Sequence, residues 1–223
     1  MLKWWQNSLK YLAKGEKTTI ATPTQPKLML TFDRFIKQLP DEDGRYELVN
    51  GEIVKILPTI RLHENVADFI ENTFQDEVKI LNLNYRLSGR IVVRTLTPNG
   101  KEQGRHPDVT VVDKTLWESQ PFAPSALTEP PQLVVEVVST NWEDDYIDKL
   151  DEYQRLGISE YWIVDYLALG SRNYLGNPKE PTVFVYLLDE NGVYQMTAYR
   201  GSDRIISRTF PELALTAEQV LDV

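Results

Sequence analysis

The 223-residue sequence has no cysteine and only two histidines, His63 and His106. Disulfides, thiolate nucleophiles and cysteine-ligated zinc or iron–sulfur sites are therefore excluded, and so is a metal site with several histidine ligands. Any metal ion would be bound mainly through oxygen, which favours Mg²⁺, Mn²⁺ or Ca²⁺. Long apolar runs are lacking too. No stretch approaches the roughly 18 residues that a membrane-spanning helix needs, so we expect no stable membrane insertion.

The first residues also lack the apolar core of a secretory signal peptide, which predicts a cytoplasmic protein. Basic residues are in deficit, because 24 lysines and arginines face 33 acids and give a formal net charge of −9. An acidic chain repels nucleic acid at long range, so DNA binding would require a local basic surface. Hydrophobic residues make up 42% of the chain, an ordinary fraction for a globular protein with a substantial core.

The pattern along the chain predicts an N-terminal extension and linker over residues 1–27 and one domain over residues 28–223. Apolar residues recur at helical spacing among lysines in residues 2–13. Such a short amphipathic helix could pack on its own domain, or contact a membrane surface or a partner. Residues 15–27 are rich in threonine and proline and have little to bury, which is typical of a linker.

Apolar periodicity in the domain predicts an α/β protein. We expect helices over residues 32–39, 62–80 and 143–156 and a short helix after Thr216. We expect strands over residues 46–49, 52–57, 84–88, 90–96, 107–112, 132–139 and 160–165, with more strands from Thr182 onward. Residues 98–104 and 119–131 are expected to form a turn and a proline-rich loop. Asn50-Gly51 suits a type I′ hairpin, because both residues tolerate positive φ.

Glu136 interrupts the apolar run Leu133–Val138, a pattern typical of a central strand covered on both faces. A buried carboxylate is costly unless it is paired, hydrogen-bonded or bound to a metal. An ion pair with an arginine, or a position at the exposed strand end, would also explain it. Asp108 opens another apolar strand directly after a proline, so its carboxylate should lie near a strand end. Two acids on neighbouring strands can together hold a hard divalent cation.

Lys149 is a third charged residue at an expected buried position. At about 100° per residue, it falls between Tyr153 and Leu156 on the apolar side of its helix, whereas three aspartates fall on the solvent side. A lysine there can snorkel, with its stem on the core and its head in water. It can also reach an interior acid, and Asp145, one turn earlier, is a candidate partner.

An ordered set of blocks from Leu28 to the C-terminus resembles the Uma-type putative restriction endonuclease family of the PD-(D/E)XK nuclease superfamily. The blocks are Tyr46–Glu52, Pro107-Asp108, Leu133–Ser139, the spacing Asp145-x3-Lys149-x3-Tyr153, and Glu160–Asp165. Each block alone has low specificity, but their order is specific. The resemblance implies an α/β (α+β) fold with a restriction-endonuclease-like αβββαβ core. A central mixed sheet would be flanked by helices, and this chain would add a β-rich C-terminal extension.

The resemblance also implies an activity, the hydrolysis of DNA phosphodiester bonds with Mg²⁺ or Mn²⁺. Asp108 and Glu136 would be the metal-binding acids, with the main-chain carbonyl of Val137 as a further ligand. All three would lie beside the scissile phosphate, and the two acids would belong to the catalytic set.

The chain departs from the superfamily at the lysine. The superfamily places it two residues after the glutamate, where this chain has Val138. Lys149 matches the lysine that the Uma-type family uses instead, and by the resemblance it would be the third catalytic residue, beside Asp108 and Glu136. Glu47 matches an additional N-terminal acid of many superfamily members. His63, at the start of a helix, is expected to be structural or to contact the substrate.

DNA contacts are expected from residues 86–105, where five basic residues face one acid, Glu102. The five are Arg86, Arg90, Arg94, Lys101 and Arg105. The same residues could merely solubilise the edge of a sheet. Two competing functions stay open: a catalytically inactive nuclease-fold module that binds nucleic acid or protein, and a hydrolase of another phosphoester. A monomer and a homodimer are both compatible with the sequence.

Overall fold

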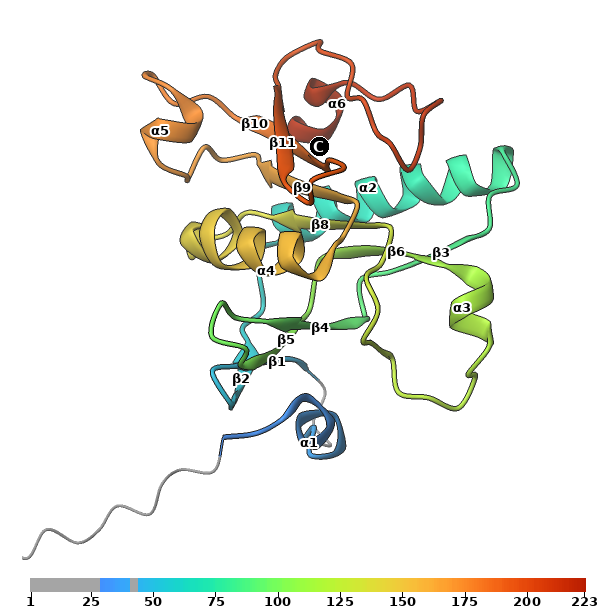
Figure 1. The fold of residues 1–223 in the computed structure, drawn as a ribbon. Coiled ribbons are helices and arrows are strands. Elements are labelled where there is room, and N and C mark those ends of the chain that lie inside the picture. The colour runs from blue at the N-terminus through green and yellow to red at the C-terminus, as the bar shows by residue number, and fades with distance from the viewer. Residues whose placement is uncertain (1–28, 41–43) are drawn as a thin grey trace, which may run out of the picture.

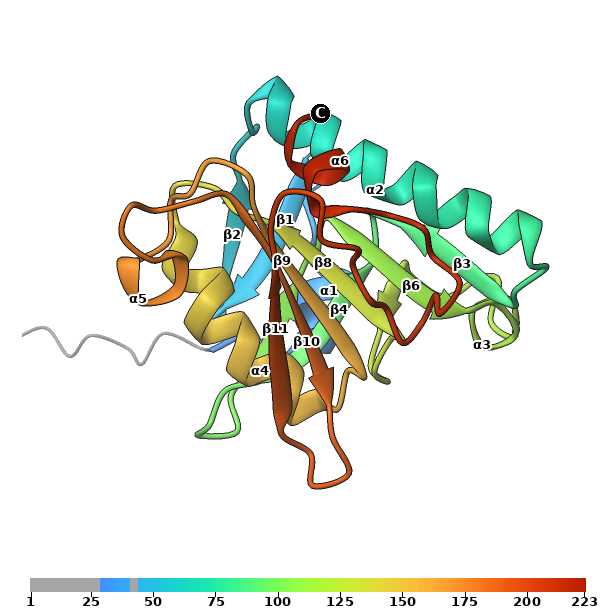
Figure 2. The ribbon, with the colours of Figure 1, turned by 90° about the horizontal axis from the view of Figure 1, so that it is seen from above.

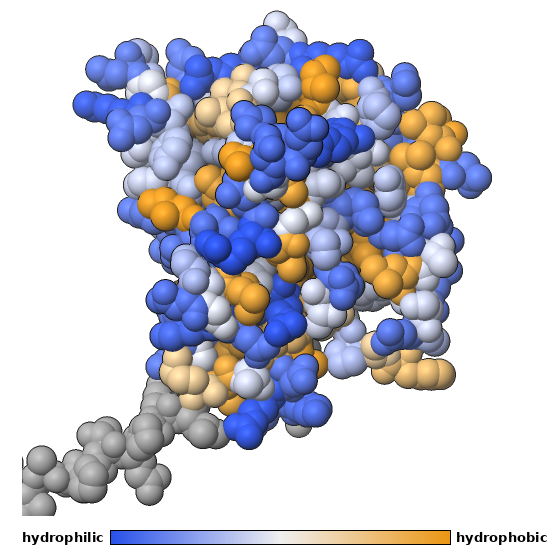
Figure 3. Space-filling view, viewed as in Figure 1, coloured by the Kyte–Doolittle hydropathy of each residue, from blue (hydrophilic) through white to orange (hydrophobic). Residues whose placement is uncertain are grey.

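The computed structural model describes residues 29–40 and 44–223. The expected extension and linker, residues 1–27 with the helix at 2–13, lie outside the described residues. The described chain contains two mixed β-sheets with helices packed on them (Figure 1). In the view of Figure 3, hydrophobic residues form small separate patches among mostly hydrophilic ones. None of the described helices is long and apolar enough to cross a membrane.

The central sheet has six strands in the order β11-β10-β9-β8-β6-β3. They are β3 (Tyr85–Ser88), β6 (Val109–Asp113), β8 (Leu133–Val137), β9 (Glu160–Asp165), β10 (Thr182–Leu188) and β11 (Tyr194–Tyr199). β8 and β9 are parallel, and the other neighbouring strands are antiparallel. A parallel pair needs a crossover. Here a π-helical turn, η1 (Asp144–Asp148), and the helix α4 (Lys149–Leu156) supply it.

The second sheet has five strands in the order β2-β1-β5-β4-β7 and lies below the central sheet in Figure 1. They are β1 (Arg45–Val49), β2 (Glu52–Ile56), β4 (Val92–Leu96), β5 (Glu102–Arg105) and β7 (Ala126–Leu127). Asn50 and Gly51 join β1 to β2 with φ values of 52° and 80°. The hairpin therefore has the two positive φ angles that this dipeptide favours.

Helices cover both faces of the central sheet. They include α2 (Arg61–Ile80) and α6 (Ala217–Leu221) on one face, and α4 and α5 (Arg172–Leu175) on the other (Figures 1 and 2). On β8, Val135 and Val137 belong to the core under α2. Val134 and Val138 belong to the core under α4. Because side chains alternate along a strand, Glu136 points to the α4 side.

The order α2, β3, β6, β8, α4, β9 is the αβββαβ order that the resemblance implies, with β4 and β5 inserted after β3. The C-terminal part is β-rich as expected, and its strands β10 and β11 continue the central sheet. One expectation needs correction. The expected turn at residues 98–104 overlaps β5, which pairs with β4 in a second sheet.

Three short elements were not expected. They are α3 (Lys114–Glu118), β7 and α5. Elements of two to five residues carry too few apolar repeats for a periodic signal. By contrast, α1 (Phe32–Lys37) begins at the expected cap, where the side chain of Thr31 accepts a hydrogen bond from the Arg34 N–H.

Candidate active site

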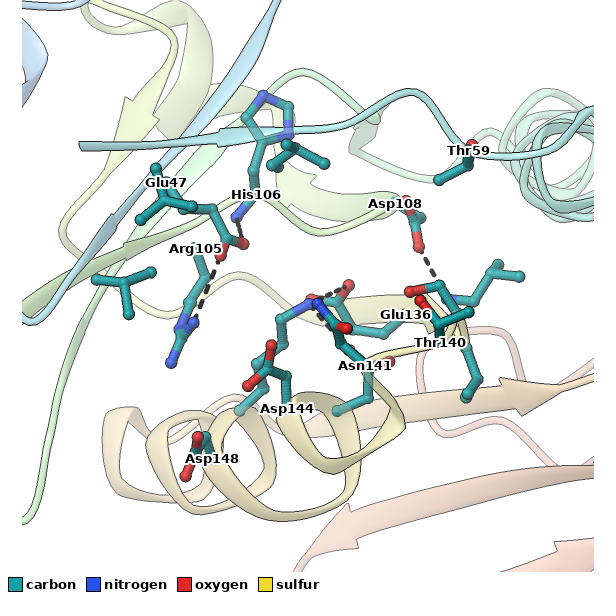
Figure 4. Close-up of a pocket in the computed structure, with 18 of the residues that line it drawn as sticks. Glu47, Thr59, Arg105, His106, Asp108, Glu136, Thr140, Asn141, Asp144 and Asp148 are labelled. Atoms are coloured by element: carbon teal, nitrogen blue, oxygen red, sulfur yellow. Dashed lines mark hydrogen bonds and ion pairs between the residues drawn. The ribbon is translucent and has the colours of Figure 1, made fainter. Parts of the chain in front are cut away.

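A cleft of about 990 Å³ opens beside the end of β8. Its lining comes from β1, β2 and the end of β5 in the second sheet, from the first turn of α2, and from η1 and α4 (Figure 4). The two sheets, the central crossover and α2 therefore all contribute side chains to one hollow.

The structure brings Asp108 and Glu136 together in this cleft. β6 and β8 are antiparallel neighbours, with Val109 opposite Val135. Asp108 directly precedes β6, and its Oδ2 accepts a hydrogen bond of 2.8 Å from the Val137 N–H (Figure 4). The Asp108 carboxylate thus lies at the end of β8, next to the residue that follows Glu136.

Lys149 reaches the same place from α4. Its Nζ lies 2.9 Å from Glu136 Oε2 and 2.9 Å from Asp145 Oδ1. One turn later, the Tyr153 hydroxyl donates a hydrogen bond of 2.6 Å to Glu136 Oε1. Residues spaced four apart share one helix face, so this single face supplies both partners of the glutamate. The ammonium group of Lys149 therefore faces interior acids and not solvent.

Burial and charge set the protonation of this pair. Burial, with the nearby carboxylates of Asp145 and Asp108, raises the pKa of Glu136 to about 8, although Lys149 opposes the shift. Burial alone would lower the pKa of Lys149, but the surrounding acids Asp145, Glu136 and Glu47 raise it well above its ordinary value. Lys149 is therefore a fixed positive charge at neutral pH.

Glu47, the additional acid, lies on β1 across the cleft from α4. It accepts a hydrogen bond of 3.1 Å from the His106 N–H and lies 3.4 Å from Arg105 Nη1 (Figure 4). Burial would raise the pKa of Glu47, but the charges of Lys149 and Arg105 and the hydrogen bond from the His106 N–H together lower the pKa below its ordinary value. Glu47 is thus an ionised carboxylate in the lining of the cleft.

Sequence reasoning missed Arg45, the cationic neighbour of Asp108. Both of its terminal nitrogens lie 3.4 Å from Asp108 Oδ1, and its Nε donates a hydrogen bond of 3.1 Å to His106 Nδ1. Burial and the Arg45 charge lower the pKa of His106 to about 4. His106 is therefore neutral at pH 7. No sequence signal marked Arg45, because its partners lie about sixty residues along the chain.

The model of the Uma2 family, described as a putative restriction endonuclease, matches residues 32–218. The chain belongs to the Uma2 family. Among solved structures it is similar to a putative nuclease belonging to DUF820 from Anabaena variabilis, with a TM-score of 0.63 and 17% identity. That match covers 86% of this chain and 98% of the other, and it shows a shared fold. A comparison with curated proteins found no match.

The donor atoms of this Uma2 chain fit a hydrated Mg²⁺ or Mn²⁺ ion. Over residues 29–40 and 44–223, no three histidine or acidic side chains are grouped to hold a metal. Mg²⁺ does not need such a cage, because it keeps several waters and is bound by one or two carboxylates and by substrate phosphate. Asp108, Glu136 and the Val137 carbonyl are oxygen donors of that kind, and the two oxygens of Glu136 already contact Lys149 and Tyr153.

The five expected DNA contacts do not gather at the site of this Uma2 chain. Four of them are absent from the cleft lining, namely Arg86, Arg90, Arg94 and Lys101. Arg105 does line it, but its side chain is only 4% exposed and makes two hydrogen bonds of 2.6–2.7 Å to Glu152. The sequence interpretation of Arg105 as a DNA contact is therefore corrected. Its strand turns it toward α4, where it forms an interior ion pair.

Gly89 packs against the main chain of Asp108 in this Uma2 fold. A Cβ added there would lie 2.5 Å from the Asp108 carbonyl oxygen. Gly89→Ala is therefore expected to lower the stability by about 1–3 kcal/mol. It should also weaken Mn²⁺ binding, because the backbone that carries the Asp108 carboxylate must shift. Urea denaturation and Mn²⁺ titration measure the two effects.

Gly104→Ala is the matched control. A Cβ at Gly104 would lie 2.9 Å from the Phe35 ring, on the α1 side of the second sheet. We expect a similar loss of stability with unchanged Mn²⁺ affinity. If Gly89→Ala binds Mn²⁺ as the wild type does, the contact does not position Asp108.

Proposed function

We propose that the protein is an endonuclease that hydrolyses DNA phosphodiester bonds with Mg²⁺ or Mn²⁺. The observation that carries the proposal is the convergence of Asp108, Glu136 and Lys149 at one end of the cleft. They arrive from two neighbouring strands and a crossover helix. Membership of a family described as a putative restriction endonuclease supports the same reaction class.

Asp108, Glu136 and the Val137 carbonyl would hold the divalent cation. When bound, the cation would polarise the scissile phosphate and lower the pKa of an attacking water. Lys149 is protonated, so it acts as a cation that offsets the negative charge developing on the phosphate oxygens. The hydroxyl of Tyr153 fixes one oxygen of Glu136 and leaves the other directed at Lys149.

The charge of the cleft also favours a metal-dependent reaction. Its lining includes eight acids (Glu47, Asp108, Glu136, Asp144, Asp145, Asp148, Asp151 and Glu152). Four basic residues line it as well: Arg45, Lys55, Arg105 and Lys149. A phosphate entering this lining meets an excess of negative charge. Bound cations would neutralise part of that negative charge, so we expect DNA to bind in the cleft and be cleaved only when divalent ions are present.

Lys149→Met tests the proposal. The thioether side chain keeps most of the packing of the lysine stem but removes the charge. We expect cleavage to fall by about 10²-fold while Mn²⁺ still binds. Plasmid nicking and calorimetric Mn²⁺ titration measure the two, and circular dichroism checks that the variant is folded.

Lys79→Met is the matched control, because Lys79 is exposed on α2 and pairs only with the exposed Asp76 among the described residues. It should cleave at the wild-type rate. A folded Lys149→Met variant that also cleaves at the wild-type rate would show that Lys149 has a structural role alone.

The second candidate function is a nuclease-fold module that binds without cleaving. Two observations favour it. The carboxylates of Glu136 and Asp145 already bind the Lys149 ammonium. The position where the superfamily usually has its lysine is occupied by the apolar residue Val138. A module of this kind would bind DNA or protein equally well with Mg²⁺ or with EDTA. Metal-dependent nicking would exclude it.

A further inference from the structure

His63 is a buried histidine in the first turn of α2, and it reaches two of the proposed metal ligands. Its Nε2 lies 2.8 Å from the Val137 carbonyl oxygen and 3.5 Å from Asp108 Oδ2. Its side chain is 4% exposed. Metal ligands in proteins are typically held in place by hydrogen bonds from neighbouring groups, and an N–H group directed at a carbonyl and close to a carboxylate can supply such bonds.

The two ring nitrogens of His63 have different surroundings. A carbonyl oxygen only accepts hydrogen bonds, so Nε2 must carry the hydrogen that Val137 accepts. Nδ1 is buried and has no hydrogen-bond partner within the described part of the chain. The nearest acid, Glu64, lies 3.8 Å from it. The contact with the site therefore depends on one nitrogen of the ring.

Both polar main-chain groups of Val137 are held by side chains. Its N–H donates to Asp108 Oδ2 at 2.8 Å, and its carbonyl accepts from His63. A carbonyl oxygen has two lone pairs, so the hydrogen bond from His63 leaves one for a cation. Val137, the last residue of β8 and part of the cleft lining, is thus fixed between α2 and the start of β6.

We propose that His63 is a positioning residue that orients the Val137 carbonyl and the Asp108 carboxylate for metal binding. This inference rests on the proposed function. His63 acts on the ligands and not on the phosphate, so its loss should weaken metal affinity. The maximal cleavage rate at saturating metal should change little.

Three substitutions in the 223-residue chain separate the hydrogen bond from simple packing. His63→Gln places an amide N–H group near the position of Nε2. His63→Asn places it near Nδ1, from which the Val137 carbonyl cannot be reached. His63→Met fills a similar volume and has no donor. Mn²⁺ affinity is measured by electron paramagnetic resonance of free Mn²⁺, and thermal unfolding in EDTA confirms that each variant is folded.

We expect Mn²⁺ affinity to fall by about tenfold or more in His63→Met and His63→Asn, and to stay near the wild-type value in His63→Gln. Excess Mn²⁺ should restore the cleavage rate of the weakened variants. If His63→Met does not fold, the Gln and Asn pair decides the question. Equal Mn²⁺ affinities in the Gln and Asn variants would overturn the inference, and so would wild-type affinity in a folded Met variant.

The same measurements separate this inference from the proposed function. A wild-type protein that binds Mn²⁺ and cleaves DNA, with His63 variants that do so equally well, would overturn the role of His63 alone. A wild-type protein that binds no Mn²⁺ would overturn the proposed function and the positioning role together.

Discussion

Asp108→Asn is expected to lower DNA cleavage by about 10³-fold or more without unfolding the protein. The asparagine side-chain oxygen can still accept the hydrogen bond from the Val137 N–H, which is 2.8 Å long in the wild type. It carries no charge, however, and the loss of several kcal/mol of attraction to a cation corresponds to a loss of this size. Single-turnover cleavage with Mg²⁺ and calorimetric titration with Mn²⁺ measure the effect.

Asp113→Asn is the matched control for this substitution. Asp113 lies at the other end of β6 and caps α3 through a hydrogen bond of 2.8 Å from the Leu116 N–H. Asparagine serves equally well at such a cap. It would lose the exposed hydrogen bond of 3.0 Å that Asn84 Nδ2 donates to Asp113 Oδ2, so stability should fall only slightly and cleavage should stay near wild type. If Asp108→Asn keeps wild-type Mn²⁺ affinity and cleavage, Asp108 is not a metal ligand.

Arg105→Met is expected to lower the free energy of unfolding by about 3–5 kcal/mol, because it leaves a buried charge without its partner. Glu152 is 4% exposed and would retain, within the described part of the chain, only the hydrogen bond of 2.6 Å from the Thr95 hydroxyl. Urea denaturation at pH 7 measures the loss.

The double variant Arg105→Met, Glu152→Leu tests the cause. It removes both charges, so it should recover part of the lost stability. Arg155→Met is the control, because Arg155 pairs with Asp151 on the surface, where such a pair contributes under about 1 kcal/mol. A loss in Arg105→Met as small as that in Arg155→Met would show that the interior pair contributes little.

The acids of the site could be predicted from the sequence because they break an otherwise apolar pattern. Glu136 lies inside a run of valines, and Asp108 begins another apolar strand, so each charge is visible against its neighbours. Lys149 was found by the periodicity of its own helix. Residues 144–148 form a π-helical turn, in which a spacing of 100° per residue does not apply. The position predicted for Lys149 is still right, because Lys149, Tyr153 and Leu156 all lie in the regular α-helix that follows.

What the sequence could not reveal depends on contacts between distant segments. The run Glu102–Arg105 forms β5 without any apolar alternation, since it is positioned by its pairing with β4 and β1. The excess of basic over acidic residues in the range 86–105 predicted a basic surface that includes Arg105. Its partner Glu152 is 47 residues away, and only the packing of the second sheet against α4 shows that the two meet. Local patterns identify a buried charge but not its partner.

The two ion pairs of Lys149 also affect the state without metal. Carboxylates that wait for a cation normally repel one another and weaken the fold. In this protein the Lys149 ammonium lies 2.9 Å from one proposed metal ligand, Glu136, and 2.9 Å from the neighbouring Asp145. Under the proposed function, folding would therefore not require bound metal, in contrast to small domains that are unfolded until their metal binds. Under the proposed function, a shortage of divalent ions would stop cleavage while the protein stays folded, and restored Mg²⁺ would act on molecules that are already folded.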